Sequence, residues 1–118
     1  MNTNEILLNL SQFIGTENYY RISPRHLLTD GSKYLAEEAQ CFWLMDAIAS
    51  HLPKQFHDHF AVANLTIDGT SAVLTLDDGS GNVFARQNIE YTDFPLDQIK
   101  LYCGFDGEHW AIMLTSEY

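Results

Sequence analysis

The chain has 118 residues, of which 46% are hydrophobic, and 16 acidic residues against six basic ones give it a net charge of −10. This length is typical of one domain, 1–118, with a single core. Such a charge argues against direct binding of DNA or RNA, whose phosphates require clustered Lys and Arg. We therefore expect no direct nucleic-acid partner. A basic protein partner stays plausible, and the alternative is that the charge serves solubility alone.

Residues 1–54 carry a net charge of −2 and residues 55–118 carry −8. No stretch approaches the roughly 18–20 apolar residues that span a bilayer. The start, MNTNEILLNLSQFIG, lacks the basic region and cleavage site of a signal peptide. Cys41 and Cys103 have no CxxC spacing, which favours reduced thiols. We expect a cytoplasmic protein with no membrane partner and no cofactor.

The first elements are predicted to be a helix and an extended segment. Residues 3–15 combine an N-cap at Thr3 with a stop signal at Gly15. Between these two ends lies an apolar stripe made of Ile6, Leu7, Leu10, Phe13 and Ile14. Residues 16–28 contain Pro24 among aromatic and β-branched residues, which indicates an extended connection or a short edge strand.

Residues 29–53 are helical in pattern, as one helix or as two with a break near Gln40. Residues 41–49, CFWLMDAIA, are apolar almost all round, which predicts a helix covered on several sides by the domain or by a second copy. Asp46 is the one ionisable residue there, and we expect it to be partly buried. It would then be a hydrogen-bonded structural anchor or a site carboxylate.

The second half has strand character. Five runs of strand length occupy residues 60–68, 71–79, 82–91, 99–105 and 109–116. Asp-Gly pairs at residues 68–69, 78–79 and 106–107 predict hairpins. Helices followed by strands indicate an α+β fold, with N-terminal helices packed on one face of a four- to five-stranded antiparallel meander sheet. Phe94 and Leu96 are expected in the core, with an interaction patch as the alternative.

Three histidines in HLPKQFHDHF are weak metal candidates: His51, His57 and His59. His57 and His59 would share a strand face, but no HExxH motif or second Cys/His pair completes a zinc site. A solvated junction between a helix and a strand explains the segment as well. Residues 77–82 resemble a calcium loop only loosely, because its spacing is absent. No serine lies in a GxSxG motif.

Four segments carry a resemblance to a known family: LLTDGSKYLAEEA, WLMDAIASH, YTDFPLDQIKLY and the final SEY. Together they resemble a family of small uncharacterised bacterial proteins, found in cyanobacteria and other bacteria and on phage or plasmid-like elements. The chain departs from that pattern at QCF and at HLP. The resemblance implies a cytoplasmic accessory protein associated with mobile elements, and it supplies no activity and no catalytic residue.

Three functions remain open. The first is a non-enzymatic acidic protein that binds a basic partner, such as an inhibitor of a host defence or nucleic-acid-handling complex that mimics phosphate charge. Its interaction residues would be Asp68, Asp77, Asp78, Asp93, Asp97, Asp106 and Glu108. The second is a homodimeric protein joined through the aromatic helix. The third is a small metal-dependent hydrolase, which requires Asp46 to converge with the histidines of residues 51–59.

Overall fold

The computed structural model describes residues 3–56 and 58–118, with side chains described from residue 4 onward. The helices are α1 (Thr3–Leu10), α2 (Asp30–Glu38) and α3 (Phe42–His51), with 3₁₀ turns η1 (Leu52–Lys54) and η2 (Thr115–Glu117). The strands are β1 (Tyr19–Ser23), β2 (His26–Thr29), β3 (Phe60–Asp68), β4 (Ser71–Asp77), β5 (Val83–Ile89), β6 (Gln98–Phe105) and β7 (Trp110–Leu114). Among these described residues, no helix is long and apolar enough to cross a membrane.

The strands form one sheet in the order β1-β2-β7-β6-β3-β4-β5. All neighbours are antiparallel except β2 and β7, which are parallel. The expected α+β class is confirmed, but the expected four- to five-stranded antiparallel meander is wrong. The segment between β5 and β6 carries the chain across to the other side of β3. Residues 19–29 add a hairpin of two strands between α1 and α2, so the helices are not all N-terminal to the sheet.

The five strand-like runs of the second half become β3 to β7. Each Asp-Gly pair lies at a hairpin end, and Gly69, Gly79 and Gly107 all have positive φ angles, between 64° and 101°. A positive φ is natural for glycine and strained for other residues, which is why these dipeptides mark the turns. Phe94 and Leu96 are buried in the β5–β6 connection, as expected for core residues.

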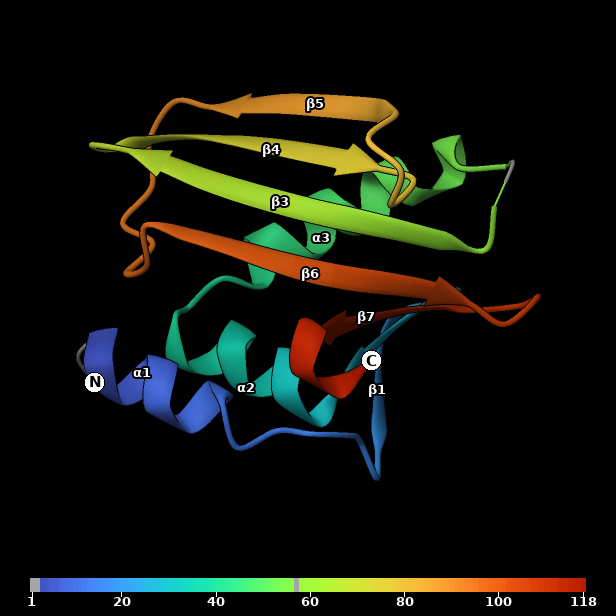
Figure 1. Cartoon of the computed structure of the whole chain (residues 1–118), viewed down its shortest axis with the longest axis horizontal. Helices are drawn as coiled ribbons and strands as arrows, with labels where there is room; N and C mark the ends of the chain where they lie inside the picture. The colour runs from blue at the N-terminus through green and yellow to red at the C-terminus, as the bar shows by residue number, and fades with distance from the viewer. Residues whose placement is uncertain (1–2, 57) are drawn as a thin grey trace.

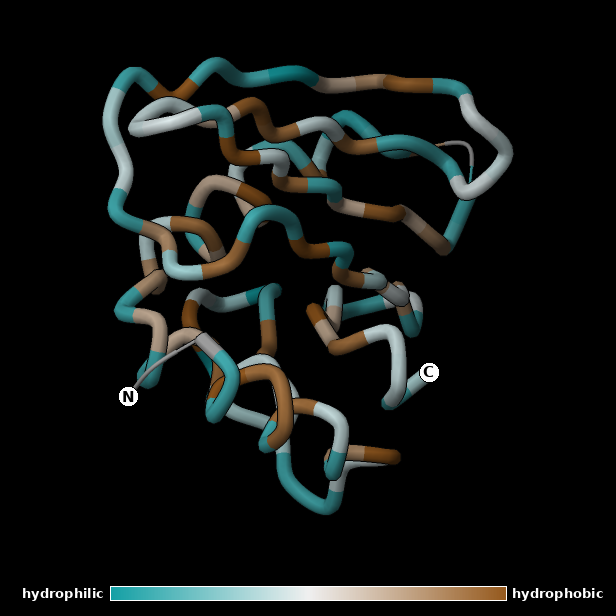
Figure 2. The backbone as a smooth tube through the Cα atoms, turned by 60° about the vertical axis from the view of Figure 1, so that its left-hand side comes forward, coloured by the Kyte–Doolittle hydropathy of each residue, from teal (hydrophilic) through white to brown (hydrophobic). Residues whose placement is uncertain are grey.

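The core lies between one face of the sheet and the helices (Figure 1). Strand register places alternate residues on that face, including Leu101 and Cys103 opposite Ala63 and Ala61. These positions are buried, whereas their sequence neighbours on the other face are mostly half-buried or exposed. Figure 2 shows this alternation as hydrophobic and hydrophilic positions that follow one another along the strands.

The predicted break near Gln40 is present, so residues 30–51 form two helices. Gln40 has a φ of 51°, a left-handed conformation that ends α2 before α3 begins. Thr29 caps the start of α2: its hydroxyl accepts the Ser32 backbone N–H at 3.2 Å, and the Ser32 hydroxyl accepts the Thr29 backbone N–H at 2.9 Å. This reciprocal pair is a capping box.

Two expectations about the helices are wrong. Asp46 is exposed, not buried, because α3 faces the core with Leu44, Met45, Ile48 and Ala49. The side of α3 that carries Asp46 also carries Phe42, which is 45% exposed. The helix expected over residues 3–15 ends at Leu10. Ile14, expected in its apolar stripe, lies beyond the helix and is 83% exposed.

Candidate functional site

The outer face of the sheet, turned away from the helical core, has an uneven composition. Toward the turns β4–β5 and β6–β7 it carries aromatic side chains. Toward the β3–β4 turn it carries polar ones, such as Thr66 and Gln98, which are exposed. Strand register sets this division, because Val62 pairs with Tyr102 and Thr66 pairs with Gln98. The aromatic end is therefore built from the first residues of β3 and the last residues of β6.

Three rings form a compact cluster at this end, which we call the ring cluster: Phe60, Tyr102 and Tyr118. The centroid of the Phe60 ring lies 5.3 Å from that of Tyr102 and 5.4 Å from that of Tyr118. The Tyr102 and Tyr118 centroids are 5.3 Å apart, with the ring planes at 76°. Edge-to-face packing of this kind is favourable for aromatic pairs. Each ring is still solvent-accessible, and Tyr118 is 77% exposed.

Phe60 is fixed in the ring cluster by the β4–β5 turn beneath it. A Cβ atom added at Gly79 would lie 3.0 Å from the edge of the Phe60 ring, and Gly79 has a φ of 87°. Only glycine meets both conditions without strain. The Asp78-Gly79 turn thus closes a hairpin and lets the edge of the Phe60 ring pack closely against Gly79.

Tyr118 reaches the ring cluster because the preceding residue anchors the end of the chain. The Glu117 carboxylate accepts hydrogen bonds from the Thr29 hydroxyl at 2.6 Å and from the Gly31 backbone N–H at 3.0 Å. It also accepts the Leu114 backbone N–H at 2.9 Å. A carboxylate at a helix N-terminus is stabilised by the free N–H groups there. Anchored in this way, η2 places the Tyr118 ring on the outer face of the sheet.

Hollows lie on both sides of Phe60 and Tyr118. One has a volume of about 600 Å³ and is lined by the two rings, His59, His109 and carboxylates from Asp58 and Asp106. The other has a volume of about 440 Å³ and is lined by the ring cluster together with Asp77 and Lys100. Both volumes fall within the range of small binding sites. The aromatic surface is therefore hollowed, with acidic side chains at its margins.

The acidic residues at this end are ordered by their own turns. Asp78 accepts the backbone N–H groups of Ser80 and Asn82 at 2.8 and 3.2 Å. Asp106 accepts those of Glu108 and His109 at 2.8 and 2.6 Å. Hydrogen bonds to the Asn82 side chain and nearby backbone lower the pKa of Asp78, and the N–H groups of His109 and Glu108 lower that of Asp106. Both groups are negatively charged at neutral pH.

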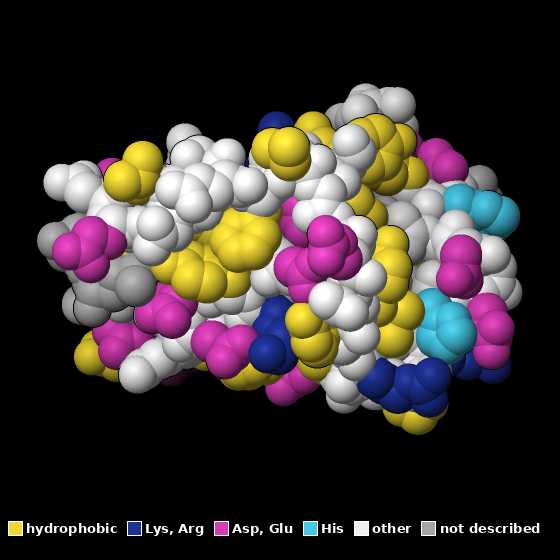
Figure 3. All heavy atoms as spheres, turned by 90° about the horizontal axis from the view of Figure 1, so that it is seen from below, with side chains coloured by type: hydrophobic (Ala, Val, Ile, Leu, Met, Phe, Trp, Pro, Cys, Tyr) yellow, Lys and Arg dark blue, Asp and Glu magenta, His cyan; other side chains and the backbone are white. Residues whose placement is uncertain are grey.

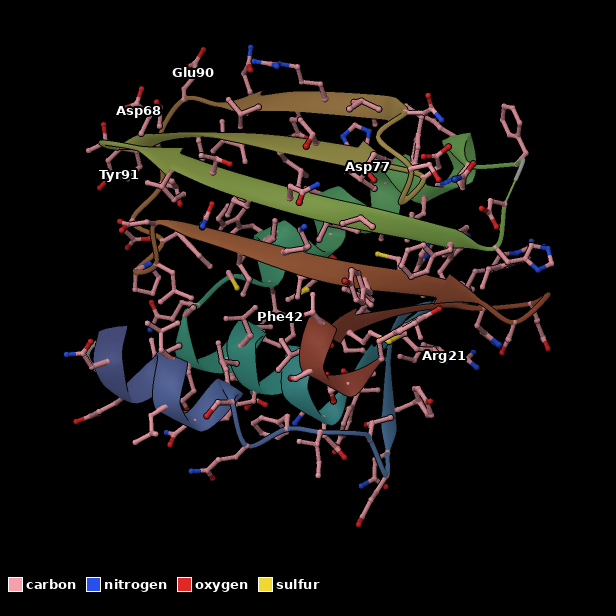
Figure 4. The ribbon with its side chains drawn as sticks, viewed as in Figure 1. Arg21, Phe42, Asp68, Asp77, Glu90 and Tyr91 are labelled. Atoms are coloured by element: carbon pink, nitrogen blue, oxygen red, sulfur yellow. The ribbon has the colours of Figure 1, made fainter. Side chains whose placement is uncertain are left out.

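The seven acidic interaction candidates do not form one surface. Asp77, Asp78, Asp106 and Glu108 lie at the aromatic end, whereas Asp68, Asp93 and Asp97 lie at the other end. Figure 4 shows Asp68 and Asp77 at these opposite ends. Asp77 pairs with Val62 of β3, six residues from Asp68 in that strand, so about 20 Å separates Asp77 from Asp68 at 3.4 Å per residue. This exceeds the Debye length of about 8 Å at physiological salt, and the two groups act independently.

Acidic side chains are also present elsewhere on the surface. In the view from below, they are scattered between hydrophobic patches, and few Lys or Arg side chains accompany them (Figure 3). Asp30 is one acidic residue with a structural role, since it accepts the Glu17 backbone N–H at 2.9 Å and the Tyr20 hydroxyl at 2.9 Å. Negative charge alone therefore does not single out one surface, whereas the ring cluster does.

The two described histidines of the weak metal set lie in different environments. The His51 Nε2 atom lies 2.8 Å from the Gln87 Oε1 atom of β5. The His59 ring packs edge-on against Phe105 of β6, with centroids 5.5 Å apart. β3 and β4 lie between β6 and β5, and the exposed Asp46 lies on α3. His57 is outside the described residues. Within the described ranges, no group of three His, Cys, Asp or Glu side chains could hold a metal ion.

The comparisons with known proteins place this architecture in a family. Residues 4–118 match the model of a family of unknown function, DUF6876. The chain belongs to this family. No curated protein matches the chain. A crystal structure of a protein of unknown function from Enterococcus faecalis is similar, with a TM-score of 0.59 and 11% sequence identity over 83% of this chain and 93% of that one. At this identity the likeness shows a shared fold.

The ring cluster was missed by the sequence analysis, although part of the signal was present. The alternation that puts Leu101 and Cys103 on the core face puts Tyr102 on the opposite face. The same parity puts Phe60 and Val62 outside. The place of Tyr118 could not be inferred in this way, because it depends on the contact between Glu117 and α2, 86 residues apart in the chain.

Proposed function

We propose that this DUF6876 protein is a non-enzymatic binding protein that holds a basic segment of a protein partner against the aromatic end of its outer sheet face. The observation that carries the proposal is the combination of the solvent-accessible ring cluster with ordered carboxylates around it. Aromatic faces attract Lys and Arg cations, and carboxylates pair with them. One surface thus offers two kinds of contact to the same basic side chain.

The hollows beside Tyr118 offer an arginine side chain aromatic rings and carboxylates in the same lining. A guanidinium group is planar, stacks on aromatic faces and donates hydrogen bonds within its plane. At the margins of these hollows, Asp58, Asp77 and Asp106 are available as acceptors. The proposed partner therefore places one or more Arg side chains beside Tyr118, with its remaining positive charge toward the acidic turns.

The split of the acidic residues narrows the earlier hypothesis of phosphate mimicry. A single partner on the ring cluster contacts the four acidic residues of the aromatic end and leaves Asp68, Asp93 and Asp97 free. The partner would thus bind to a compact acidic and aromatic surface instead of a long row of charges. Inhibition of a defence or nucleic-acid-handling complex remains one role that such binding would serve, through basic residues of the target.

The test is affinity capture from a host lysate with three baits at low and high salt. The first bait is the wild-type chain. The second is Asp77→Asn, Asp106→Asn and Glu108→Gln combined, in which each Asn keeps an oxygen that accepts its turn hydrogen bonds. The third, the matched control, is Asp68→Asn, Asp93→Asn and Asp97→Asn combined, which removes the same number of charges at the other end.

The proposal expects a stoichiometric partner that binds the wild-type and control baits, is lost from the second bait, and dissociates at high salt. Capture by all three baits alike, or capture that is unaffected by salt, would contradict it. Self-association that depends on concentration and is the same in all three proteins would favour the homodimer instead. The exposed side of α3, with Phe42 45% exposed, would then be the place to examine.

A further inference from the structure

A groove between α1 and β6 differs in composition from the hollows at the ring cluster. It has a volume of about 550 Å³, which is within the range of sites for small ligands. Its apolar lining comes from Leu7, Leu10, Leu65, Leu96, Ile99 and Leu114. The rest of the lining consists of hydroxyl and amide side chains and a single charged residue, Lys100.

The path of β7 explains why the groove is open. Leu114 pairs with Leu101, and the chain then turns into η2, so Gln98–Lys100 of β6 extend beyond the end of β7. Helix α1 lies beside this gap without filling it, and its Leu7 side chain is 51% exposed. Apolar surface from the helix and the strand thus remains accessible, which favours an apolar ligand.

The charge around the groove is unusual for this chain. The hollows beside the ring cluster, beside Tyr20 and beside Phe84 each contain at least one Asp or Glu. The described residues that line this groove include none. In a chain with a net charge of −10, the described lining of this groove thus offers an anion a lysine and no carboxylate in direct contact.

Lys100 is available to such an anion. The residue is exposed, and its ammonium group makes no ion pair within 4.0 Å with a described residue. It also lines the hollow that contains Asp77, so its flexible side chain lies between an acidic neighbour and the groove. Among the neutral side chains of the same lining, the Ser11 hydroxyl donates to the Leu8 carbonyl at 2.6 Å and the Asn64 amide donates to Asp77 at 3.1 Å. The Gln98 amide is exposed and can donate to a carboxylate.

We propose that this groove binds a small amphipathic monoanion, a free carboxylate with an apolar chain. The apolar chain lies against Leu7 of α1 and Ile99 of β6, and the carboxylate pairs with Lys100. This groove shares Lys100 with a hollow of the basic-partner surface, and the proposal rests on a different observation, the absence of acidic residues from its described lining. The chain would then hold two kinds of ligand on one sheet, a basic protein segment and a small apolar acid.

The experiment titrates the full chain with octanoate, octylammonium, 1-octanol and acetate, followed by methyl NMR and calorimetry. Octanoate should bind and shift the methyl signals of Leu7, Ile99 and Leu114. Acetate lacks the chain and octylammonium reverses the charge, so both should bind at least about tenfold more weakly. Lys100→Ala should weaken octanoate about tenfold, the effect of one charge-assisted contact. Lys54→Ala, an exposed lysine beside His51, is the matched control and should change nothing.

A second variant adds a negative charge to the groove and leaves Lys100 in place. Thr66 is exposed and lines the groove, so Thr66→Glu introduces a carboxylate there. It should abolish octanoate binding and favour octylammonium. Equal binding of octanoate and octylammonium to the wild-type chain, no effect of Lys100→Ala, or shifts confined to other residues would overturn the proposal. The triple variant at Asp77, Asp106 and Glu108 should still bind octanoate, so failure of the partner site and failure of this site are distinguishable.

Discussion

The backbone N–H of Gly31, in the first turn of α2, donates a 3.0 Å hydrogen bond to the carboxylate of Glu117, the penultimate residue of the chain. The two residues are 86 positions apart. A Cβ atom at Gly31 would lie 2.5 Å from the Glu117 Oε1 atom and 2.6 Å from the Leu114 Cδ1 atom. The glycine thus permits the close approach that fixes the C-terminus against the helix.

Replacing Gly31 tests this close approach. Gly31→Ala should lower the free energy of unfolding by about 1–3 kcal/mol, because Leu114 and the Glu117 carboxylate must move to make room. Urea denaturation measures the change. Gly15→Ala is the matched control, since nothing lies within 4 Å of a Cβ atom there. Equal effects of the two substitutions would mean that the contact between Gly31 and Glu117 is not tight in solution.

Glu117→Ala removes the acceptor instead of crowding it. Three donors would then lose a partner: the Thr29 hydroxyl and the N–H groups of Gly31 and Leu114. Thr29 is 1% exposed, so water cannot easily replace that partner. We expect a loss of about 1–3 kcal/mol in the free energy of unfolding, together with a change in the NMR signals of the Tyr118 ring. Glu90→Ala, at an exposed position, should stay within about 0.5 kcal/mol of the wild type. Loss of stability with no change at Tyr118 would show that Glu117 does not determine the position of the Tyr118 ring.

The two thiols should be inert in the folded protein. Burial raises the pKa of Cys41 to about 12 and raises that of Cys103 as well. Because the thiolate is the reactive form, native protein at pH 8 should react with iodoacetamide only as fast as it unfolds. Above a pH of about 9, where thiols of the unfolded chain ionise and the buried ones do not, the free energy of unfolding should fall. Rapid labelling of the native protein, followed by mass spectrometry, would contradict the burial.

The hydrogen bonds that the Asp30 carboxylate accepts should make the free energy of unfolding fall in acid. Hydrogen bonds from the Glu17 backbone and the Tyr20 hydroxyl hold the pKa of Asp30 below its ordinary value of 3.8. The stabilisation is therefore present above pH 3.8 and is lost as the pH falls through the lower folded-state pKa. Asp30→Ala should be less stable than the wild type at pH 6, and the difference should shrink toward pH 2. A difference that does not depend on pH would show that the charge of Asp30 is not involved.

Local patterns predicted the elements of the second half well, because each strand is bounded by an Asp-Gly turn and alternates about a buried face. Long-range relations were not predictable in this way. The parallel contact of β2 with β7 joins His26 to Trp110, and nothing in either segment specifies the other. The α+β class could thus be predicted, whereas the order of the strands could not.

In the candidate site, too, local features could be predicted and long-range relations could not. The charge of the second half was visible in the sequence, but strand direction sends Asp68 and Asp77 to opposite ends of the sheet. Asp46 was misjudged because CFWLMDAIA is apolar in composition, while the helix buries only the side with Leu44, Met45, Ile48 and Ala49. The ring cluster requires β3, β6 and the C-terminus to meet, which is a tertiary relation.

The most direct test of the account is an NMR titration of the chain with an arginine-rich peptide, compared with the same peptide in which every Arg is replaced by Gln. If basic segments bind at the aromatic end, the Arg peptide alone should shift the ring signals of Phe60, Tyr102 and Tyr118 and the backbone signals of the β4–β5 and β6–β7 turns. Tyr102→Ala should weaken this binding, while Asp68→Asn should not. Shifts centred on Asp68, Asp93 and Asp97, or spread evenly over the acidic surface, would contradict it.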